Sequence, residues 1–132
     1  MIEKKLTKVN YAMKVEKYIK NATNPILPKE AKIMKNLRNT RIDAIPSIHH
    51  FGQELSSDGK TMMNIMIMDL LGPSMQESFA KADYRCNLEA ALNFGIGVID
   101  VLAKIHAQGV VYRDVKPENF CLSLKPNSKG LY

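Results

Sequence analysis

Residues 110–120 constrain this chain more than any other stretch, because a polar segment lies there between two short apolar runs. The polar segment carries Asp114, Lys116 and Asn119 within six residues, and Pro117 stiffens the backbone between them. The three side chains offer a carboxylate that can accept a proton, a cation, and an amide oxygen that can bind a metal ion. An ordinary polar loop between a helix and a strand is the alternative. That alternative suits an isolated D-x-K-x-x-N better than the full string Y-R-D-V-K-P-E-N-F.

The full string resembles the protein-kinase catalytic loop, H-R-D-x-x-x-x-N. It is most similar to the serine/threonine kinases of the casein kinase 1 family, some of which carry Tyr before Arg-Asp. Two further strings resemble the same family in the same order. Residues 11–16 (Y-A-M-K-V-E) are similar to its V-A-I-K strand, and residues 69–74 (D-L-L-G-P-S) are similar to its hinge.

The resemblance covers nearly the whole chain and implies an α+β, protein-kinase-like fold that is incomplete. The small lobe would be an antiparallel sheet with one helix, and the large lobe would be represented by its first helices and the catalytic loop. Residues 1–71 would form the remainder of the small lobe and the hinge, and residues 72–132 the start of the large lobe.

The resemblance also implies a function, the transfer of the ATP γ-phosphoryl group to protein Ser or Thr, with ATP and Mg²⁺ as cofactors. Asp114 would be the base, Lys116 would stabilise the charge on the γ-phosphoryl group, and Asn119 would bind magnesium. Lys14, positioned by Glu30, would hold the α- and β-phosphates. The other implied ATP contacts are the backbone of Asp69 and Leu71 at the adenine edge, the gatekeeper Met68, and Cys121 on the pocket floor, where the family usually has Leu.

Two of these residues also have plainer interpretations. Lys14 could be a solvated strand lysine. Glu30 could be a first-turn glutamate that interacts favourably with the helix dipole.

Hydrophobic periodicity predicts the order of strands and helices along the chain. Ser74 and Glu77 form an S-x-x-E capping box, and Gly109 should terminate the longest helix. The predicted elements are strands at 9–16, 48–55 and 61–70, a hairpin turn at 56–60, helices at 29–38, 74–82 and 88–108, a short strand at 120–124 and a turn at 126–130.

The charge of the chain is +6 and is unevenly placed, since residues 1–41 hold eleven Lys and Arg against three Glu. A basic protein suits acidic or already phosphorylated protein substrates, although a solvated lysine face is the plainer interpretation. Because Trp is absent, we expect no nucleic-acid partner. No apolar run approaches the ~20 residues of a membrane span. Cys86 and Cys121 show no metal spacing, which indicates reduced thiols and a cytoplasmic or nuclear location.

Two kinase motifs do not occur in the sequence: no G-x-G-x-x-G precedes Lys14, and there is no Asp-Phe-Gly. We therefore expect a fragment or truncated product of a kinase gene that is inactive alone. A non-catalytic, pseudokinase-like module that docks a partner or a nucleotide is the first alternative. A basic nucleic-acid binder is the second, and a steep salt dependence of binding would reveal it.

Overall fold

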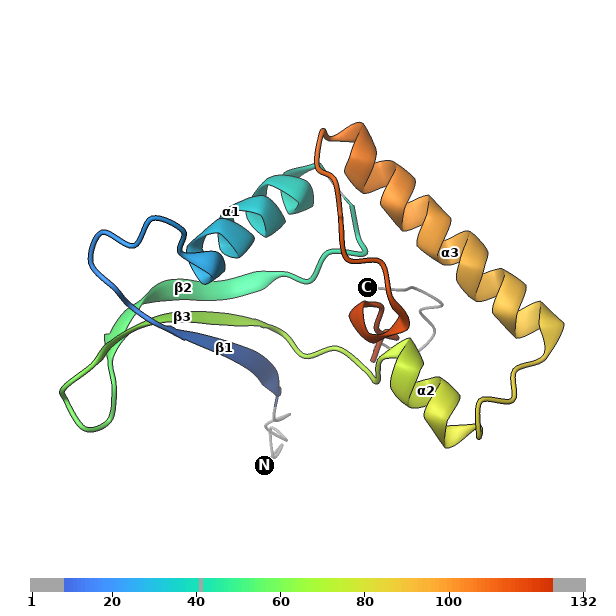
Figure 1. The fold of residues 1–132 in the computed structure, drawn as a ribbon, viewed down its shortest axis with the longest axis horizontal. Helices are drawn as coiled ribbons and strands as arrows, with labels where there is room; N and C mark the ends of the chain where they lie inside the picture. The colour runs from blue at the N-terminus through green and yellow to red at the C-terminus, as the bar shows by residue number, and fades with distance from the viewer. Residues whose placement is uncertain (1–8, 41, 125–132) are drawn as a thin grey trace, which may run out of the picture.

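The computed structural model describes residues 9–40 and 42–124 of the chain. A three-stranded sheet with one helix lies on one side, and two helices and the 110–120 segment lie on the other (Figure 1). This arrangement agrees with the predicted α+β class. In chain order the elements are β1 (Tyr11–Lys17), α1 (Ile26–Asn39), β2 (Ile48–Leu55), β3 (Met62–Asp69), α2 (Met75–Lys81), α3 (Leu88–Ala107) and a 3₁₀ turn, η1 (Pro117–Asn119).

The sheet is antiparallel, with β3 between β1 and β2. Alternate residues of β3 are buried, because successive side chains of a strand point to opposite faces. Met66 and Met68 pack against Leu27 and Ala31 of α1, which forms the core of this part. Lys14 lies opposite Met66 in the β1–β3 register, so its side chain projects toward the face that α1 covers.

A second core joins the two parts of the chain. Leu37 at the end of α1 packs with Val101 and Ile105 of α3, and Ile42 and Ile45 fill the space between them. These contacts place α3 and the segment that follows it beside the C-terminal end of α1.

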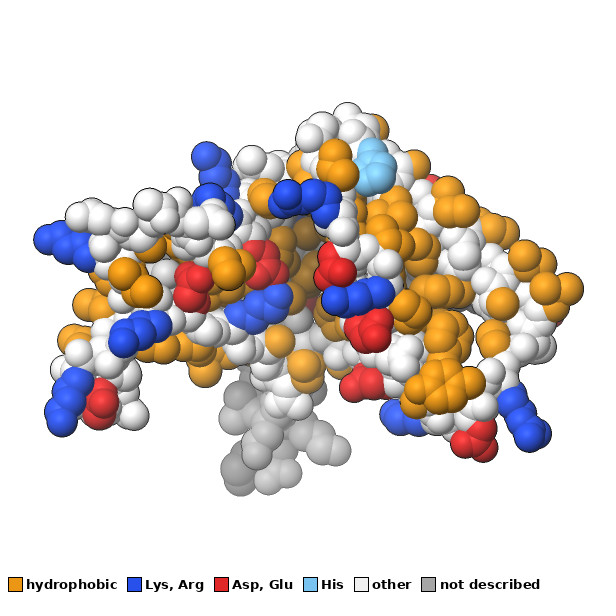
Figure 2. Space-filling model, in the orientation of Figure 1, with side chains coloured by type: hydrophobic (Ala, Val, Ile, Leu, Met, Phe, Trp, Pro, Cys, Tyr) orange, Lys and Arg blue, Asp and Glu red, His pale blue; other side chains and the backbone are white. Residues whose placement is uncertain are grey.

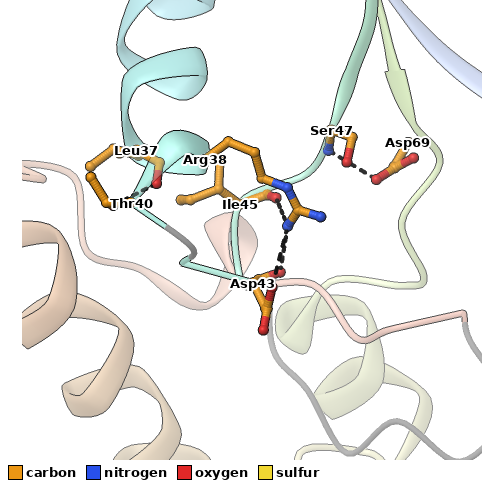
Figure 3. Close-up of polar contacts among 7 residues, drawn as sticks. All are labelled: Leu37, Arg38, Thr40, Asp43, Ile45, Ser47 and Asp69. Atoms are coloured by element: carbon orange, nitrogen blue, oxygen red, sulfur yellow. Dashed lines mark hydrogen bonds and ion pairs between the residues drawn. The ribbon is translucent and has the colours of Figure 1, made fainter.

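The loop between α1 and β2 is held by hydrogen bonds at both ends (Figure 3). Arg38 donates to the carbonyl of Ile45 at 3.1 Å, and the Thr40 hydroxyl donates to the carbonyl of Leu37 at 2.7 Å. At the other end the Ser47 N–H donates to the Asp69 carboxylate at 2.9 Å. The loop is therefore tied both to α1 and to the end of β3.

The two predicted helices of the second part are confirmed. Ser74 and Glu77 form the complete capping box at the start of α2. Asn87 caps α3 by accepting from the Ala90 N–H at 2.7 Å. Gly109 follows the helix with a φ of 75°, a conformation that glycine adopts without strain.

Helix α1 begins earlier than predicted, at Ile26 instead of residue 29. Pro28 precedes the predicted helix, but the first turn of a helix tolerates proline because an N–H at that position would have no helical partner. Glu30 consequently lies in the second turn of α1. The interpretation of Glu30 as a first-turn glutamate is therefore wrong.

The predicted strand at residues 120–124 is also wrong. Residues 120–124 carry isolated bridges in place of a strand. Within residues 9–40 and 42–124, Cys121 forms a bridge with Ser74, supported by hydrogen bonds between Gly72 N–H and Leu122 O (2.9 Å) and between Leu122 N–H and Pro73 O (3.0 Å). A Cβ at position 72 would lie 2.7 Å from the Leu122 carbonyl oxygen, so only glycine fits there. The predicted turn at 126–130 lies outside the described residues.

Candidate active site

An ion pair links β1 to α1 at the edge of the candidate site. The Lys14 Nζ atom lies 2.5 Å from Glu30 Oε1. The lysine side chain is 49% exposed and the glutamate side chain 34%. An exposed pair of this kind contributes only about 0–1 kcal/mol to folding. Stability alone is therefore a weak explanation for the pair.

The 110–120 segment brings its polar groups together around Asp114. Turn η1 folds Asn119 back, so that its Nδ2 donates to the Asp114 carbonyl and to Asp114 Oδ2, both at 2.8 Å. The Lys116 Nζ atom lies 2.9 Å from the same Oδ2. Since both Asn119 bonds use Nδ2, the amide oxygen of this side chain is the group left to meet a cation.

These contacts stabilise the charged forms of Asp114 and Lys116. The ammonium of Lys116, and after it the amide of Asn119, hold the pKa of Asp114 below its ordinary value. The Asp114 carboxylate in turn raises the pKa of Lys116. Both groups are therefore charged at neutral pH, with the carboxylate ready to accept a hydrogen bond from a hydroxyl group.

Aromatic side chains anchor the segment on both sides of Asp114. Tyr112 stacks on Phe120 with ring centroids 5.7 Å apart, and Phe120 is only 3% exposed. Phe120 also meets Phe94 of α3 edge-on at 6.2 Å. Arg113 has a φ of 66°, a left-handed conformation that is costly for a non-glycine residue and that is found often at functional sites.

A cavity of about 780 Å³ separates β1 and α1 from residues 110–119. Figure 2 shows it as a hollow at the centre of this face, with acidic and basic side chains gathered around it. The volume falls in the range of small-molecule sites. Of the residues that sequence analysis assigned to ATP or catalysis, those that line the cavity are Lys14, Glu30, Met68, Leu71, Asp114 and Asn119.

The other three assigned residues do not line the cavity. Lys116 is not a lining residue but forms an ion pair with Asp114, which is one. The side chain of Asp69 bonds instead to Ser47 N–H and to His49 Nε2, the latter at 2.7 Å. The Asp69 N–H donates to the Ser47 carbonyl at 3.0 Å, so the Asp69 carbonyl is the backbone group to consider for adenine.

Cys121, expected on the pocket floor, is not among the residues that line the cavity, and its backbone forms a bridge with Ser74. Burial, and after it the negative charge of Glu77, raises the pKa of the Cys121 thiol.

Glu16 has no role predicted from the sequence, although it lies two residues after Lys14 and so on the same face of β1. Its carboxylate accepts hydrogen bonds from the backbone of Ile26 and Leu27 in α1 and from the side chain of Asn64 in β3. The spacing of two residues indicates that Glu16 and Lys14 share one face of β1. The contact of Glu16 with the N-terminus of α1 could not be predicted, because the sequence did not show that the helix begins at Ile26.

Comparison with known proteins identifies the family of this chain. The chain matches the protein kinase domain family over residues 1–129. It is similar to casein kinase I homolog RAG8 of Kluyveromyces lactis, with 32% identity over 103 residues, which are 78% of this chain and 18% of that protein. It is also similar to casein kinase I homolog 2 of Saccharomyces cerevisiae, with 33% identity over 98 residues, which are 74% of this chain and 16% of that protein.

Casein kinase I homolog 3 of Schizosaccharomyces pombe shows 33% identity over 88 residues, which are 67% of this chain and 18% of that protein. The chain thus spans less than a fifth of the length of these relatives. The predicted fold, an incomplete protein-kinase-like fold, is confirmed by the family match and by the three-stranded sheet with its helices. The chain therefore belongs to the protein kinase domain family, and within that family it is of the casein kinase I type.

Proposed function

We propose that the protein containing this chain transfers the γ-phosphoryl group of ATP to Ser or Thr hydroxyls of other proteins. The observation that supports this most strongly is the placement of Asp114 and Asn119 across one cavity from the Lys14–Glu30 pair. Phosphoryl transfer depends on positioning and charge stabilisation, which these four side chains can supply.

In the proposed reaction the substrate hydroxyl oxygen forms a bond to the γ-phosphorus while the bond from that phosphorus to the ADP oxygen breaks. Asp114 accepts the hydroxyl proton, and ADP leaves with the electron pair of the broken bond. Lys116, paired with Asp114, offsets negative charge on the phosphoryl oxygens. Lys14 holds the α- and β-phosphates, Glu30 orients Lys14, and the backbone at Asp69 and Leu71 bonds the adenine edge.

Magnesium fits this site only in part. The amide oxygen of Asn119 suits a hard cation, and Mg²⁺ would neutralise phosphate charge there. The described residues hold no cluster of three or more His, Cys, Asp or Glu able to bind a metal ion. Asn119 alone is a weak ligand, so phosphate oxygens, water and further carboxylates must complete the coordination.

Substrate class and location complete the proposal. The excess of basic residues in 1–41 favours acidic or already phosphorylated protein substrates. Within the described residues no helix has the length and apolar character needed to cross a bilayer. A cytoplasmic or nuclear location is proposed from the two free cysteines.

A radiolabelled ATP assay on an acidic protein substrate tests the proposal. The full-length protein should transfer phosphate at roughly 1–100 per second. Asp114→Asn should lower this rate by at least about a hundredfold, because the general base is lost. Asp100→Asn is the matched control, since it removes an exposed carboxylate of α3 that pairs with Lys104. Equal rates for Asp114→Asn and the wild type would overturn the proposal.

The 132-residue chain assayed alone should show no transfer, because it contains neither G-x-G-x-x-G nor Asp-Phe-Gly. Phosphate transfer by this chain, abolished by Asp114→Asn, would show that those elements are dispensable.

A non-catalytic binding module is the second candidate function. The observation in its favour is that Lys14, Glu30 and Leu71 line the cavity while no carboxylate cluster for magnesium is found in the described part of the chain. Nucleotide binding by the full-length protein without phosphate transfer would select this candidate.

A further inference from the structure

We propose that Glu16 is a positioning residue: it holds the N-terminus of α1 against β1, so that Glu30 meets Lys14. This inference rests on the proposed function, because the Lys14–Glu30 pair matters for the reaction only if Lys14 holds the ATP phosphates. Glu16 itself does not line the candidate active site. It would act through the helix.

The N-terminus of α1 has an unusual set of backbone donors. A helix leaves its first four N–H groups without helical partners. In α1 two of these positions are Pro25 and Pro28, which carry no N–H. The other two, Ile26 and Leu27, donate to the Glu16 carboxylate at 2.9 and 3.3 Å. Glu16 thus satisfies all the free donors of this helix end, and the N-cap residue Pro25 makes no side-chain bond of its own.

Two further side chains of the sheet hold Glu16 in place. Asn64, 3% exposed and directly opposite Glu16 in the register, donates from Nδ2 to Glu16 Oε2 at 3.1 Å. Gln53 of β2 donates in turn to Asn64 Oδ1 at 3.3 Å. The three side chains form a row across the three strands. The carboxylate is therefore fixed by a buried amide and does not depend on solvent for its orientation.

The spacing of the contacts explains how a cap can position an ion pair. Lys14 and Glu16 are two residues apart on β1, which is about 6.7 Å along a strand. Ile26 and Glu30 are four residues apart on α1, about 6 Å along the helix axis. Each β1 residue meets its α1 partner, Glu16 at Ile26 and Lys14 at Glu30. Strand β1 thus contacts α1 at two positions, and these positions have nearly the same separation along the strand as along the helix.

The charge of Glu16 strengthens this attachment. A carboxylate at a helix N-terminus interacts favourably with the helix dipole. The hydrogen bond from Ile26, and after it that from Asn64, lower the pKa of Glu16, so the group is ionised at neutral pH. The ionised form offers an oxygen to each of the two helix N–H groups.

A zero-length cross-link measures the proposed positioning directly. A carbodiimide joins the Lys14 amine to the Glu30 carboxyl only while the two groups are in contact, and mass spectrometry of the digested chain quantifies the product. Glu16→Gln keeps the side-chain length but removes the charge and one acceptor. We expect this variant to lower the Lys14–Glu30 cross-link yield roughly fivefold, the usual effect of losing a helix cap. Glu54→Gln, on the exposed side of β2, is the matched control and should give the wild-type yield.

Hydrogen exchange in the same variants separates a local effect from general unfolding. With Glu16→Gln, peptides covering residues 26–33 should exchange roughly fivefold faster, while β3 keeps its wild-type protection. An unchanged cross-link yield would overturn the proposal. Loss of protection in β3 as well would also overturn it, because Glu16 would then be a general stabilising residue without a specific effect on Glu30.

Nucleotide binding by the full-length wild-type protein distinguishes this inference from the proposed function. If the full-length protein does not bind ATP but Glu16→Gln still lowers the cross-link yield, the proposed function fails and the structural role of Glu16 stands. If ATP binds and the cross-link yield is unaffected by Glu16→Gln, only the inference about Glu16 fails.

Discussion

Lys14 is the residue on which the proposed nucleotide site most depends, because it is the cation that projects from β1 into the cavity. Its bond to Glu30 is exposed and contributes little to folding. We therefore expect Lys14 to contribute to ATP binding and to contribute little to the free energy of unfolding. A substitution can therefore remove the cation while leaving the fold intact.

We predict that Lys14→Met weakens ATP binding by roughly tenfold to a hundredfold, the usual contribution of a charge-assisted hydrogen bond. The thermal stability of the chain should change little. Lys17→Met, three residues further along β1 and exposed, is the matched control. Fluorescence titration with a labelled ATP analogue measures the affinity. Equal losses for the two variants would contradict a specific role for Lys14.

The charge state of Asp114 leads to a pH prediction. Because the folded-state pKa of Asp114 is lowered, its contact with Lys116 is fully present above the ordinary carboxyl range and is lost as the pH falls through the lowered value. Because the pKa of Lys116 is raised, the contact also persists to alkaline pH. The pair should thus be constant between roughly pH 5 and pH 9.

Carboxyl-carbon NMR titration checks this expectation. Lys116→Met should move the pKa of Asp114 upward toward its ordinary value, while Lys104→Met, which removes a lysine that pairs with Asp100, should not. An Asp114 that titrates identically in all three proteins would show that Lys116 does not control it.

At the scale of the elements, the regular parts of the fold could be predicted because their signals are local. β2, β3, α2 and α3 follow from hydrophobic periodicity and from the caps at Ser74 and Gly109. The start of α1 could not be predicted in the same way. Its cap is Glu16, which lies ten residues before Ile26 and on a different element. A contact between two elements that are distant in the sequence produces no local sequence pattern from which it could be predicted.

The same distinction applies to the candidate site. The spacing of Asp114, Lys116 and Asn119 within one segment predicted a local cluster, and the three side chains are in contact. The assignment of Cys121 to the pocket floor came from the family resemblance alone, and Cys121 is not among the residues that line the cavity.

The capping box gives a prediction at this scale. Ser74→Ala should destabilise α2 by about 1 kcal/mol, because the N–H of Glu77 loses its acceptor. Hydrogen exchange of residues 75–81 should accelerate roughly fivefold, with α3 unaffected. Ser57→Ala in the β2–β3 turn serves as the control substitution. Unchanged exchange in α2 would show that the box contributes nothing measurable.

At the scale of the whole molecule, α3 is apolar on more than one side. One side packs into the core through Val98, Val101 and Ile105. The other side is open, and Figure 2 shows apolar side chains gathered over α3 and α2. The exposed apolar residues of this helix are Leu88, Leu92, Ile96 and Ile99, with exposures of 74%, 55%, 65% and 68%.

We predict that the isolated chain binds a hydrophobic dye strongly or aggregates, since large exposed apolar patches promote both. The double variant Leu92→Glu/Ile99→Glu should reduce dye fluorescence and aggregation without unfolding the chain. Val101→Glu should instead unfold it, because Val101 is 9% exposed. A monomeric wild-type chain with a sharp cooperative melt and no dye binding would contradict this prediction.

The central claim is that the cavity between Lys14–Glu30 and Asp114–Asn119 binds ATP, and an ATP acyl-phosphate probe tests it most directly. Such a probe binds as ATP does and transfers its acyl group to a lysine amine close to the phosphates, so it needs no catalytic turnover. We predict that mass spectrometry will find Lys14 and Lys116 acylated ahead of Lys17 and Lys104, which do not line the cavity, and that excess ATP will prevent it. Uniform acylation of the exposed lysines, unaffected by ATP, would contradict the claim.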